Sequence, residues 1–424
     1  MLQVTYIREN KDQVIAGLGK RKFANAEDVI NEVLELDDLR KSTQQKHDEA
    51  QSESNALSKE IGTLMKAGKK DEAEEIKQKT ADLKVQVKDH GERLTQYESD
   101  LKALLYKIPN VPNNDVPEGA GENDNVTVEQ HGDVPELFEG ALPHWELIKK
   151  YDIIDFELGN KITGAGFPVY RGKGARLQRS LVNYFLDKAV EAGYMEVQPP
   201  ILINEESGYG TGQLPDKDGQ MYFVREENFY LIPTAEVPIT NMYRDVIVNS
   251  DDLPIKHVGF TPCFRREAGS WGAHVRGLNR LHQFDKVEIV EIHHPDDSYA
   301  ALERMCNHVK GLLESLNLPY RVLNLCGADL SFTSAQTFDM EVFSAAQQKW
   351  LEVSSVSNFE TYQANRLKLR CKGKDNKSFF LHTLNGSALA LPRILAAILE
   401  NNQTEDGIKI PEVLVPYTGF DSIN

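Results

Sequence analysis

The sequence predicts an α+β protein in which an N-terminal antiparallel helical hairpin precedes a domain built on an antiparallel or mixed sheet. One observation is an apolar seam near the N-terminus that alternates steps of four and three residues, as coiled-coil helices do. The other is a series of β-branched and aromatic segments in the second half that follow one another without intervening helix. Such a series favours an antiparallel or mixed sheet over a doubly wound parallel one.

The hairpin is predicted from two seams and the turn between them. The stronger seam runs through Ile76, Thr80, Leu83, Val87, His90, Leu94, Tyr97, Leu101, Leu104 and Ile108. A weaker seam precedes it, through Leu36, Leu39, Thr43, Ala50, Leu57, Ile61 and Leu64. Gly68 lies between them and can end one helix before the next begins. Two long helices joined by so short a turn run antiparallel, and about 30 to 40 residues in each give an arm of roughly 45–60 Å.

Composition divides the chain into residues 1–108, a linker of residues 109–137 and a C-terminal domain of residues 138–424. The linker begins with a stretch dense in Pro, Asn and Gly, which cannot continue a helix. In the C-terminal domain we expect helices over residues 175–192, 298–316 and 389–401, and strands over residues 221–232, 255–264, 282–292 and 349–356.

Charge and cysteine content exclude several classes of protein. Four scattered cysteines without a CxxC pair or a neighbouring histidine cluster argue against a disulfide framework and a structural zinc site. No apolar stretch approaches the roughly 18–20 residues of a membrane helix, and no signal-like segment begins the chain, so we expect a cytoplasmic protein without membrane contact. The net charge of −17 does not exclude nucleic acid, because binding depends on where basic residues cluster.

The arm itself has balanced charge, with 14 basic and 14 acidic residues between Asp38 and Lys107. From charge alone, a solvated spacer or dimerisation hairpin is favoured over a lever that grips a large partner. The basic residues at its tip, Lys66, Lys69 and Lys70, favour a polyanion only weakly.

A strand, a loop rich in Gly, His and Arg, and a second strand are predicted between residues 260 and 291. Strand alternation places Arg265 and Glu267 on one face and Arg266 on the other. On the returning strand Phe284, Lys286 and Glu288 share a face. A guanidinium, an aromatic ring and carboxylates suit a nucleotide's phosphate, base and amino group. On these residues alone, an ordinary cross-strand Arg–Glu pair on a solvated surface remains an equal alternative.

Four strings and the hairpin carry a resemblance to a known family. Residues 264–267 (FRRE) resemble motif 2 of the class II aminoacyl-tRNA synthetases, residues 386–393 (GSALALPR) resemble motif 3, and the helix over 176–192 followed by GYMEVQPPIL resembles motif 1, with Pro200 as its proline. The fuller strings FTPCFRREAGS, HQFDKVE, LIPTAEVP and HTLNGSALA resemble seryl-tRNA synthetase of the bacterial type, essentially over the whole length. The family often has Ser where this chain has Arg266.

The resemblance implies a class II catalytic domain, an antiparallel sheet flanked by helices, over residues 138–424. It implies a two-step reaction: serine attacks the α-phosphorus of ATP to form seryl-adenylate, and the ester then passes to the terminal adenosine of tRNA(Ser). A carboxylate needs no general base, so catalysis is expected from positioning and electrostatics. Use of tRNA(Sec) stays open. The alternatives are an amino acid:carrier-protein ligase, whose relatives lack the arm, and a non-catalytic RNA-binding paralogue with damaged sites.

Site residues follow from the same resemblance. The implied ATP-binding residues are Arg265, Arg266, Glu267, Val275, Phe284, Glu352, Val353, Ser354, Ser355 and Arg393. Arg265, on the α-phosphate and the serine carboxylate, and Arg393, on the γ-phosphate, are the implied catalytic pair, and Glu352 and Ser355 are the implied Mg²⁺ ligands. The implied serine-binding residues are Thr234, Ala235, Glu236, Arg265, Glu288 and Ser387.

Some of these residues have plainer explanations. Ser387 could cap a helix, Glu352 could lie at a sheet edge, and Arg393 could extend from its helix into solvent. Alternation turns Arg266 away from the nucleotide, toward a tRNA acceptor end or a neighbouring carboxylate.

The resemblance also implies two macromolecular partners. One is tRNA(Ser), which the helical arm contacts at its elbow and long extra arm. The other is a second copy of the chain, in a homodimer formed around Pro200.

Overall fold

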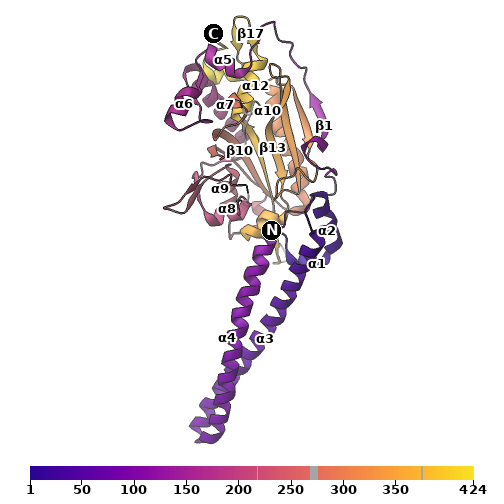
Figure 1. The fold of residues 1–424 in the computed structure, drawn as a ribbon, viewed down its shortest axis with the longest axis vertical. Helices are drawn as coiled ribbons and strands as arrows, with labels where there is room; N and C mark the ends of the chain where they lie inside the picture. Colours follow the sequence, from indigo (N-terminus) through magenta and orange to yellow (C-terminus); the bar gives the residue numbers. More distant parts are fainter. Residues whose placement is uncertain (217, 268–275, 374–375) are drawn as a thin grey trace. The chain divides into compact units, whose positions relative to one another are not determined.

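The structure is a computed structural model that describes residues 1–216, 218–267, 276–373 and 376–424. The chain forms two compact units (Figure 1). The smaller unit comprises residues 2–19 and 23–109, and the larger unit comprises residues 1, 20–22 and 110–424. The domain boundaries predicted from composition, at 108 and 138, remain predictions.

The smaller unit is helical and its long hairpin is confirmed. Its helices are α1 (Val4–Glu9), α2 (Lys11–Lys20), α3 (Ala26–Lys66) and α4 (Lys70–Leu105). The helices α3 and α4 run side by side in opposite directions (Figure 1). Gly68 in the turn has φ +77°, a left-handed conformation that glycine adopts without the steric cost of a Cβ atom.

The predicted seam of α4 is confirmed, since none of its ten positions is exposed. In α3 the prediction of Leu39 is wrong, because this side chain is 40% exposed. The buried stripe passes instead through Val33, Asp37 and Thr43, with Arg40 half-buried, so Leu39 lies beside it. The apolar pattern did not reveal these buried positions, because one of them is held by the charged residue Asp37.

Asp37 is stabilised by three cations. Its carboxylate pairs with Arg8 Nη2 at 2.9 Å, Arg40 Nη2 at 2.9 Å and Lys41 Nζ at 2.7 Å, and its side chain is only 4% exposed. Burial raises the pKa of this carboxyl, but hydrogen bonds from Lys41, Arg40 and Arg8 outweigh burial and lower the pKa to about 2. This cluster fixes α1 against the base of α3.

Asp37→Asn is expected to lower the free energy of unfolding by about 1–3 kcal/mol, because it leaves the cations without a buried negative partner. The pKa of Asp37 in the folded protein lies below that of an unfolded aspartate. Its contribution is therefore full near neutral pH and is lost as the pH falls toward 2. Thermal unfolding followed by circular dichroism at neutral pH and at about pH 3 measures both effects.

Asp38→Asn is the matched control. Asp38 pairs with the same Arg8 at 2.7 Å, but its side chain is 62% exposed, so its loss should cost at most about 0.5 kcal/mol. Equal destabilisation by the two substitutions would contradict the role given to burial.

The larger unit is built on an eight-stranded sheet in the order β1-β11-β12-β13-β16-β10-β9-β4. These strands are β1 (Val126–His131), β11 (Tyr320–Asn324), β12 (Gln336–Ser344), β13 (Lys349–Asn358), β16 (His382–Ala390), β10 (Gln283–His293), β9 (Ile255–Phe264) and β4 (Met195–Glu196). All neighbours pair antiparallel except β4 and β9. The prediction of an antiparallel rather than a doubly wound sheet is confirmed.

The rest of the larger unit consists of helices and small sheets. The remaining helices are α5 (His144–Lys150), α6 (Phe156–Ile162), α7 (Gly172–Glu191), α8 (Glu205–Thr211), α9 (Glu236–Asn241), α10 (Ser298–Ser315), α11 (Thr361–Leu367), α12 (Leu391–Asn401) and α13 (Val415–Thr418). Small sheets are formed by β2 (Ile154–Asp155) with β3 (Val169–Tyr170), β5 (Leu202–Asn204) with β7 (Phe229–Leu231) and β6 (Phe223–Val224), β15 (Ser378–Phe380) with β14 (Arg370–Lys372) and β8 (Ile247–Asn249), and β17 (Gln403–Thr404) with β18 (Gly407–Lys409) and β19 (Ser422–Ile423).

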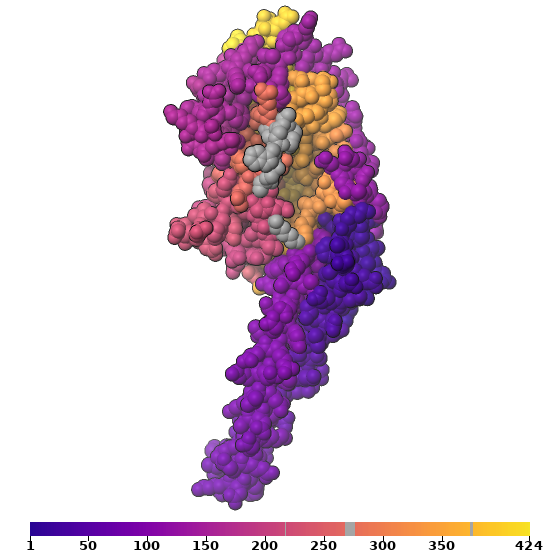
Figure 2. Space-filling view, in the orientation of Figure 1, coloured from indigo at the N-terminus to yellow at the C-terminus, as the bar shows by residue number. Residues whose placement is uncertain are grey.

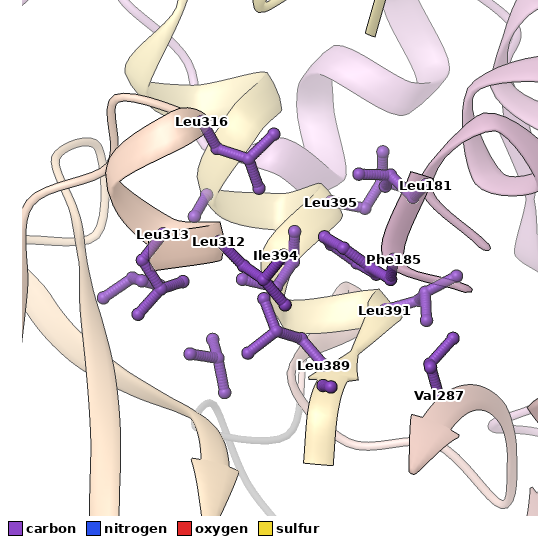
Figure 3. Close-up of a cluster of buried hydrophobic side chains, with 14 of the residues drawn as sticks. Leu181, Phe185, Val287, Leu312, Leu313, Leu316, Leu389, Leu391, Ile394 and Leu395 are labelled. Atoms are coloured by element: carbon purple, nitrogen blue, oxygen red, sulfur yellow. The ribbon is translucent and has the colours of Figure 1, made fainter. Parts of the chain in front are cut away.

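The core lies where α7, α10 and α12 pack on one face of the large sheet. Figure 3 shows Phe185 of α7 and Leu312 of α10 near Ile394 of α12, with Val287 of β10 at the edge of the same cluster. Each of these side chains is at most 3% exposed. Because Val287 points into this core, the side chains before and after it in β10 point to the other face of the sheet.

Several predicted elements begin or end elsewhere; for example, the helix predicted from residue 175 begins at Gly172. The helix predicted from Leu389 begins at Leu391, because residues 386–390 belong to β16 and pair with β10 and β13. Pro392 then stands in the first helical turn, where its missing N–H costs nothing. The strand predicted over residues 221–232 is a short hairpin of β6 and β7, which turns at Asn228 with φ +56°. No helix in the described ranges is long and apolar enough to cross a membrane.

Candidate active site

The face of the sheet opposite the core carries a cavity of about 780 Å³. Strands β10, β13 and β16 supply its floor, and segments before and after the strands, including the residues that follow β9, supply its walls. Figure 2 shows the pink to red segment (about residues 200–260) on the left of the larger unit and the orange segment (about residues 310–360) on its right. Both segments contribute residues to the cavity.

Most of the site residues predicted from the sequence line this cavity: Thr234, Glu236, Arg265, Glu267, Phe284, Glu288, Glu352, Val353, Ser354, Ser355, Ser387 and Arg393. Two do not. Ala235 is fully buried among Ile239 and Val290, and Arg266 does not line the cavity. Val275 lies outside the described residues.

Arg265 and Phe284 form one end of the cavity. The Arg265 guanidinium lies 5.3 Å from the centroid of the Phe284 ring. The pairing of β9 with β10 brings them together, because Phe284 faces Cys263 in the register and the Arg265 amide donates to the His282 carbonyl at 2.9 Å. A cation beside an aromatic plate can hold a phosphate next to a stacked base.

Glu267 has an ion-pair partner that sequence reasoning missed. Its carboxylate pairs with Arg280, which also lines the cavity. Arg280 lies 13 residues after Glu267 and just before β10, so the distance along the chain hid the pairing.

Arg393 is held in place and does not extend into solvent. Its Nη1 donates to the Glu352 carbonyl at 2.7 Å, and its Nε donates to the Asn279 carbonyl at 3.1 Å. Nη1 also lies 3.7 Å from the Glu352 carboxylate, which is 51% exposed. The arginine therefore stands at the cavity wall with its orientation fixed before any ligand binds.

The groups near Glu352 and Ser355 fit a divalent cation of the hard, oxygen-binding kind. Register pairs Asp339 of β12 with Ser355 of β13, and the Oδ1 atom of Asp339 is buried without a hydrogen-bond partner among the described residues. Burial and the nearby Glu352 charge raise the pKa of Asp339 well above its ordinary value, although a hydrogen bond from Ser355 opposes this. The Glu352 carboxylate, the Asp339 carboxyl group and the Ser355 hydroxyl would form an all-oxygen donor set, which Mg²⁺ prefers. Asp339 was missed because only the register reveals it.

Glu288 lies at the other end of the cavity within a network of donors. Asn385 Nδ2 donates to Glu288 Oε1 at 2.9 Å, and Ser387 Oγ donates to Oε2 at 3.3 Å. Lys286 Nζ lies 2.7 Å from the same Oε2. Ser387 stands in the middle of β16, so the alternative that it caps a helix is wrong.

Glu236 faces the same end from the start of α9 and is 7% exposed. Gln363 Nε2 donates to its Oε1 at 2.7 Å, and Gln363 is in turn held by Thr383 Oγ1 at 2.7 Å. Burial raises the pKa of Glu236 to about 7, and the Glu288 charge adds to this, while Gln363, Lys286 and Arg265 oppose it. The carboxyl therefore titrates near neutral pH.

Comparison with known proteins identifies the family. Residues 1–112 match the seryl-tRNA synthetase N-terminal domain, and residues 222–402 match the tRNA synthetase class II core domain (G, H, P, S and T). A serine–tRNA ligase of Salinibacter ruber is 48% identical over 425 residues, covering 100% of this chain and 99% of that protein. The chain belongs to the seryl-tRNA synthetase family. Its enzyme class is that of the aminoacyl-tRNA ligases.

Other relatives support the same assignment. A serine–tRNA ligase of Chlorobium chlorochromatii is 45% identical and matches over 100% of both chains. The crystal structure of seryl-tRNA synthetase from Pyrococcus horikoshii complexed with ATP superposes with a TM-score of 0.92 at 32% identity, covering 100% of this chain and 99% of that one. The cytoplasmic serine–tRNA ligase of Naegleria fowleri in complex with AMP gives a TM-score of 0.88 at 28% identity, with the same coverage.

The titration of Glu236 leads to a prediction for serine use. If its carboxylate pairs with the substrate ammonium, kcat/KM for serine in pyrophosphate exchange should rise about tenfold per pH unit below a pKa near 7 and level off above it. The raised pKa means that the protonated, non-binding form dominates as the pH falls through 7. Initial rates between about pH 6 and pH 8 measure this.

Glu236→Gln supplies the control, because its amide keeps the shape and an acceptor for Gln363 but cannot titrate. We expect kcat/KM for serine to fall by about 10²-fold and the acidic limb to disappear. An acidic limb that persists in this variant would show that another group titrates.

Proposed function

We propose that the chain activates L-serine with ATP to form seryl-adenylate and pyrophosphate, and then transfers the seryl group to the 3′-terminal adenosine of tRNA(Ser) with release of AMP. The observation that carries this is the cavity itself, which joins two fixed arginines at one end to two buried carboxylates at the other. The arginines suit a triphosphate and the carboxylates suit the ammonium and hydroxyl of a small amino acid.

In the first step, Arg265 binds the α-phosphate and the serine carboxylate together. Its planar fork can hold one oxygen of each reactant, which brings the attacking carboxylate to the phosphorus and offsets the repulsion between two anions. Phe284 stacks on the adenine, Glu267 accepts from its amino group, and Arg393 binds the γ-phosphate. These groups are in place before the reaction, so they stabilise the developing phosphoryl charge without reorganising.

Mg²⁺ belongs to this proposal, with Glu352 and Ser355 as its protein ligands. When bound, it would neutralise charge on the phosphate oxygens. The orphaned Oδ1 of Asp339 beside Ser355 supports a cation at this place.

Serine is selected by polar contacts at the buried end. Glu236 takes the ammonium, with Thr234 beside it, and Glu288 and Ser387 meet the hydroxyl. Alanine leaves their polar atoms unpaired, which discriminates strongly, whereas threonine is excluded by the space that its methyl group requires.

The helical hairpin is proposed to bind tRNA(Ser) by backbone and shape. A homodimer is proposed around the motif 1 region, where apolar side chains stand exposed at Met195 (64%), Ile201 (37%) and Leu202 (42%). A cytoplasmic location completes the proposal, and the four cysteines, which are free thiols, suit that reducing compartment.

ATP–pyrophosphate exchange with serine, threonine, alanine or glycine, without tRNA, tests the function. We expect exchange that depends on serine, and a loss of about 10²-fold or more in kcat/KM for Arg265→Ala, the scale of a lost preorganised charge contact. Exchange with glycine or alanine in place of serine would indicate a carrier-protein ligase. A folded protein without exchange would indicate a synthetase fold that has lost its chemistry.

The arm is tested by shortening it in register. Removal of residues 52–65 together with residues 71–84 takes two heptads from each helix and keeps the native turn at Gly68. Exchange with serine should stay within about twofold, because activation needs no RNA, while kcat/KM for charging of tRNA(Ser) should fall by about 10²-fold or more. Equal loss of both activities would mean that the arm serves folding instead.

A further inference from the structure

Lys286 is a buried cation at the serine end of the cavity for which the proposed mechanism has no role. Its side chain is 7% exposed, and its Nζ lies 2.7 Å from Glu288 Oε2. Lysine is seldom buried unless it is paired, because removing an ammonium from water costs several kcal/mol. Its alternation in β10 places it on the cavity face, between Phe284 and Glu288. A methionine or leucine would fill the same space without that cost.

Hydrogen-bond capacity shows what Lys286 does to Glu288. A carboxylate offers about four acceptor positions, two on each oxygen. Lys286 and Ser387 occupy Oε2, and Asn385 occupies one position on Oε1. Among the described contacts, one position on Oε1 remains. Glu288 therefore presents a single, oriented acceptor to the cavity.

Charge distinguishes Glu288 from Glu236. The ammonium of Lys286 neutralises Glu288, whereas the group that bonds Glu236 is the neutral amide of Gln363, at 2.7 Å. Glu236 feels the charges of two cations, Lys286 and Arg265, but neither is its hydrogen-bond partner. In the proposed function Arg265 binds the phosphate and the serine carboxylate. A substrate ammonium is thus drawn to Glu236, and Glu288 is left for a neutral donor.

We propose that Lys286 is a positioning residue for amino acid specificity: by pairing with Glu288 it reserves that carboxylate for the serine hydroxyl. The inference rests on the proposed function, since it assumes that serine occupies this end of the cavity. Without Lys286, Glu288 becomes a second anionic site for an ammonium, and amino acids that lack a hydroxyl gain an alternative way to bind. The simpler explanation, an ion pair that only supports the fold, predicts no selective effect on serine.

The experiment compares Lys286→Met, Glu288→Gln and the double variant in ATP–pyrophosphate exchange with serine and with alanine. For Lys286→Met we expect kcat/KM for serine to fall by about 10²-fold, kcat/KM for alanine to change by less than about tenfold, and the KM for ATP to stay within about twofold. Lys286→Arg keeps the cation and should restore part of the preference for serine.

The double variant separates a positioning role from a structural one. If Lys286 acts through Glu288, the double variant should be no worse with serine than Glu288→Gln alone, because the two losses are not additive. The double variant also keeps a neutral pair in the site, so it tests the proposal even where Lys286→Met alone folds poorly. Additive losses, or equal losses with serine and alanine, would overturn the proposal.

Lys310→Met is the matched control, since Lys310 makes an ion pair of 2.9 Å with Glu129 and neither residue lines the cavity. Its kinetics should match the wild type. Wild-type protein without serine-dependent exchange would overturn both the proposed function and this inference. Serine-dependent exchange with an unchanged serine-to-alanine ratio in Lys286→Met would overturn this inference alone.

Discussion

The alternation of side chains along β10 is the constraint on which both the core and the site depend. Val287 and Ile289 point into the core beneath α7 and α12, while Lys286 and Glu288 line the cavity. A slip of one residue would bury the two charges in the apolar core and expose the two aliphatic side chains. The register is fixed on both sides, because β10 pairs with β9 along most of its length and with β16 on its other edge.

The segment from β16 into α12 extends that control to another part of the cavity. It supplies both Ser387 and Arg393 to the cavity lining without an intervening loop. Farther along α12, the buried Glu400 bonds His144 Nδ1 at 2.6 Å, and His144 Nε2 accepts from the Leu278 amide at 2.8 Å.

This bonding fixes the residue next to Leu278, which is Asn279, whose carbonyl accepts from Arg393. The Glu400 carboxyl has its pKa lowered by the His144 contacts although burial opposes this, so the network holds a charged group at its centre. The arginine at the cavity wall is therefore positioned from the far side of the helix that carries it.

Sequence periodicity could predict which side chains share a face of the sheet, but not which residues from other strands and helices bond to them. Strand alternation alone placed Arg265, Phe284 and Glu288 on one face, because each position depends on local geometry. Asn385 could not be found in this way, because it meets Glu288 through the pairing of β10 with β16, which are distant in the sequence. Asp339 could not be found either, because it meets Ser355 only through the register of β12 against β13, which strand alternation does not specify. Asp37 shows the same limit in the hairpin. It occupies a buried position of α3 because Arg8 of another helix pairs with it, whereas the apolar pattern assigned the buried position to Leu39.

The arrangement of charge explains how an acidic protein can bind a polyanion. With a net charge of −17, the chain as a whole repels phosphate, so attraction must be local. Three cations of the cavity are paired with carboxylates: Arg280 with Glu267, Lys286 with Glu288, and Arg393 with Glu352. These pairs orient the side chains while keeping the unliganded cavity close to neutral.

Arg265 differs from those three cations, because it lies over Phe284 and pairs with no carboxylate among the described residues. Its guanidinium keeps its donors for incoming groups, and in the proposed reaction two anionic reactants need such a group. If every cation were unpaired, the cavity would bind anions indiscriminately; if every cation were paired, none could bring carboxylate and phosphate together. Leaving one arginine unpaired beside three paired cations satisfies both requirements.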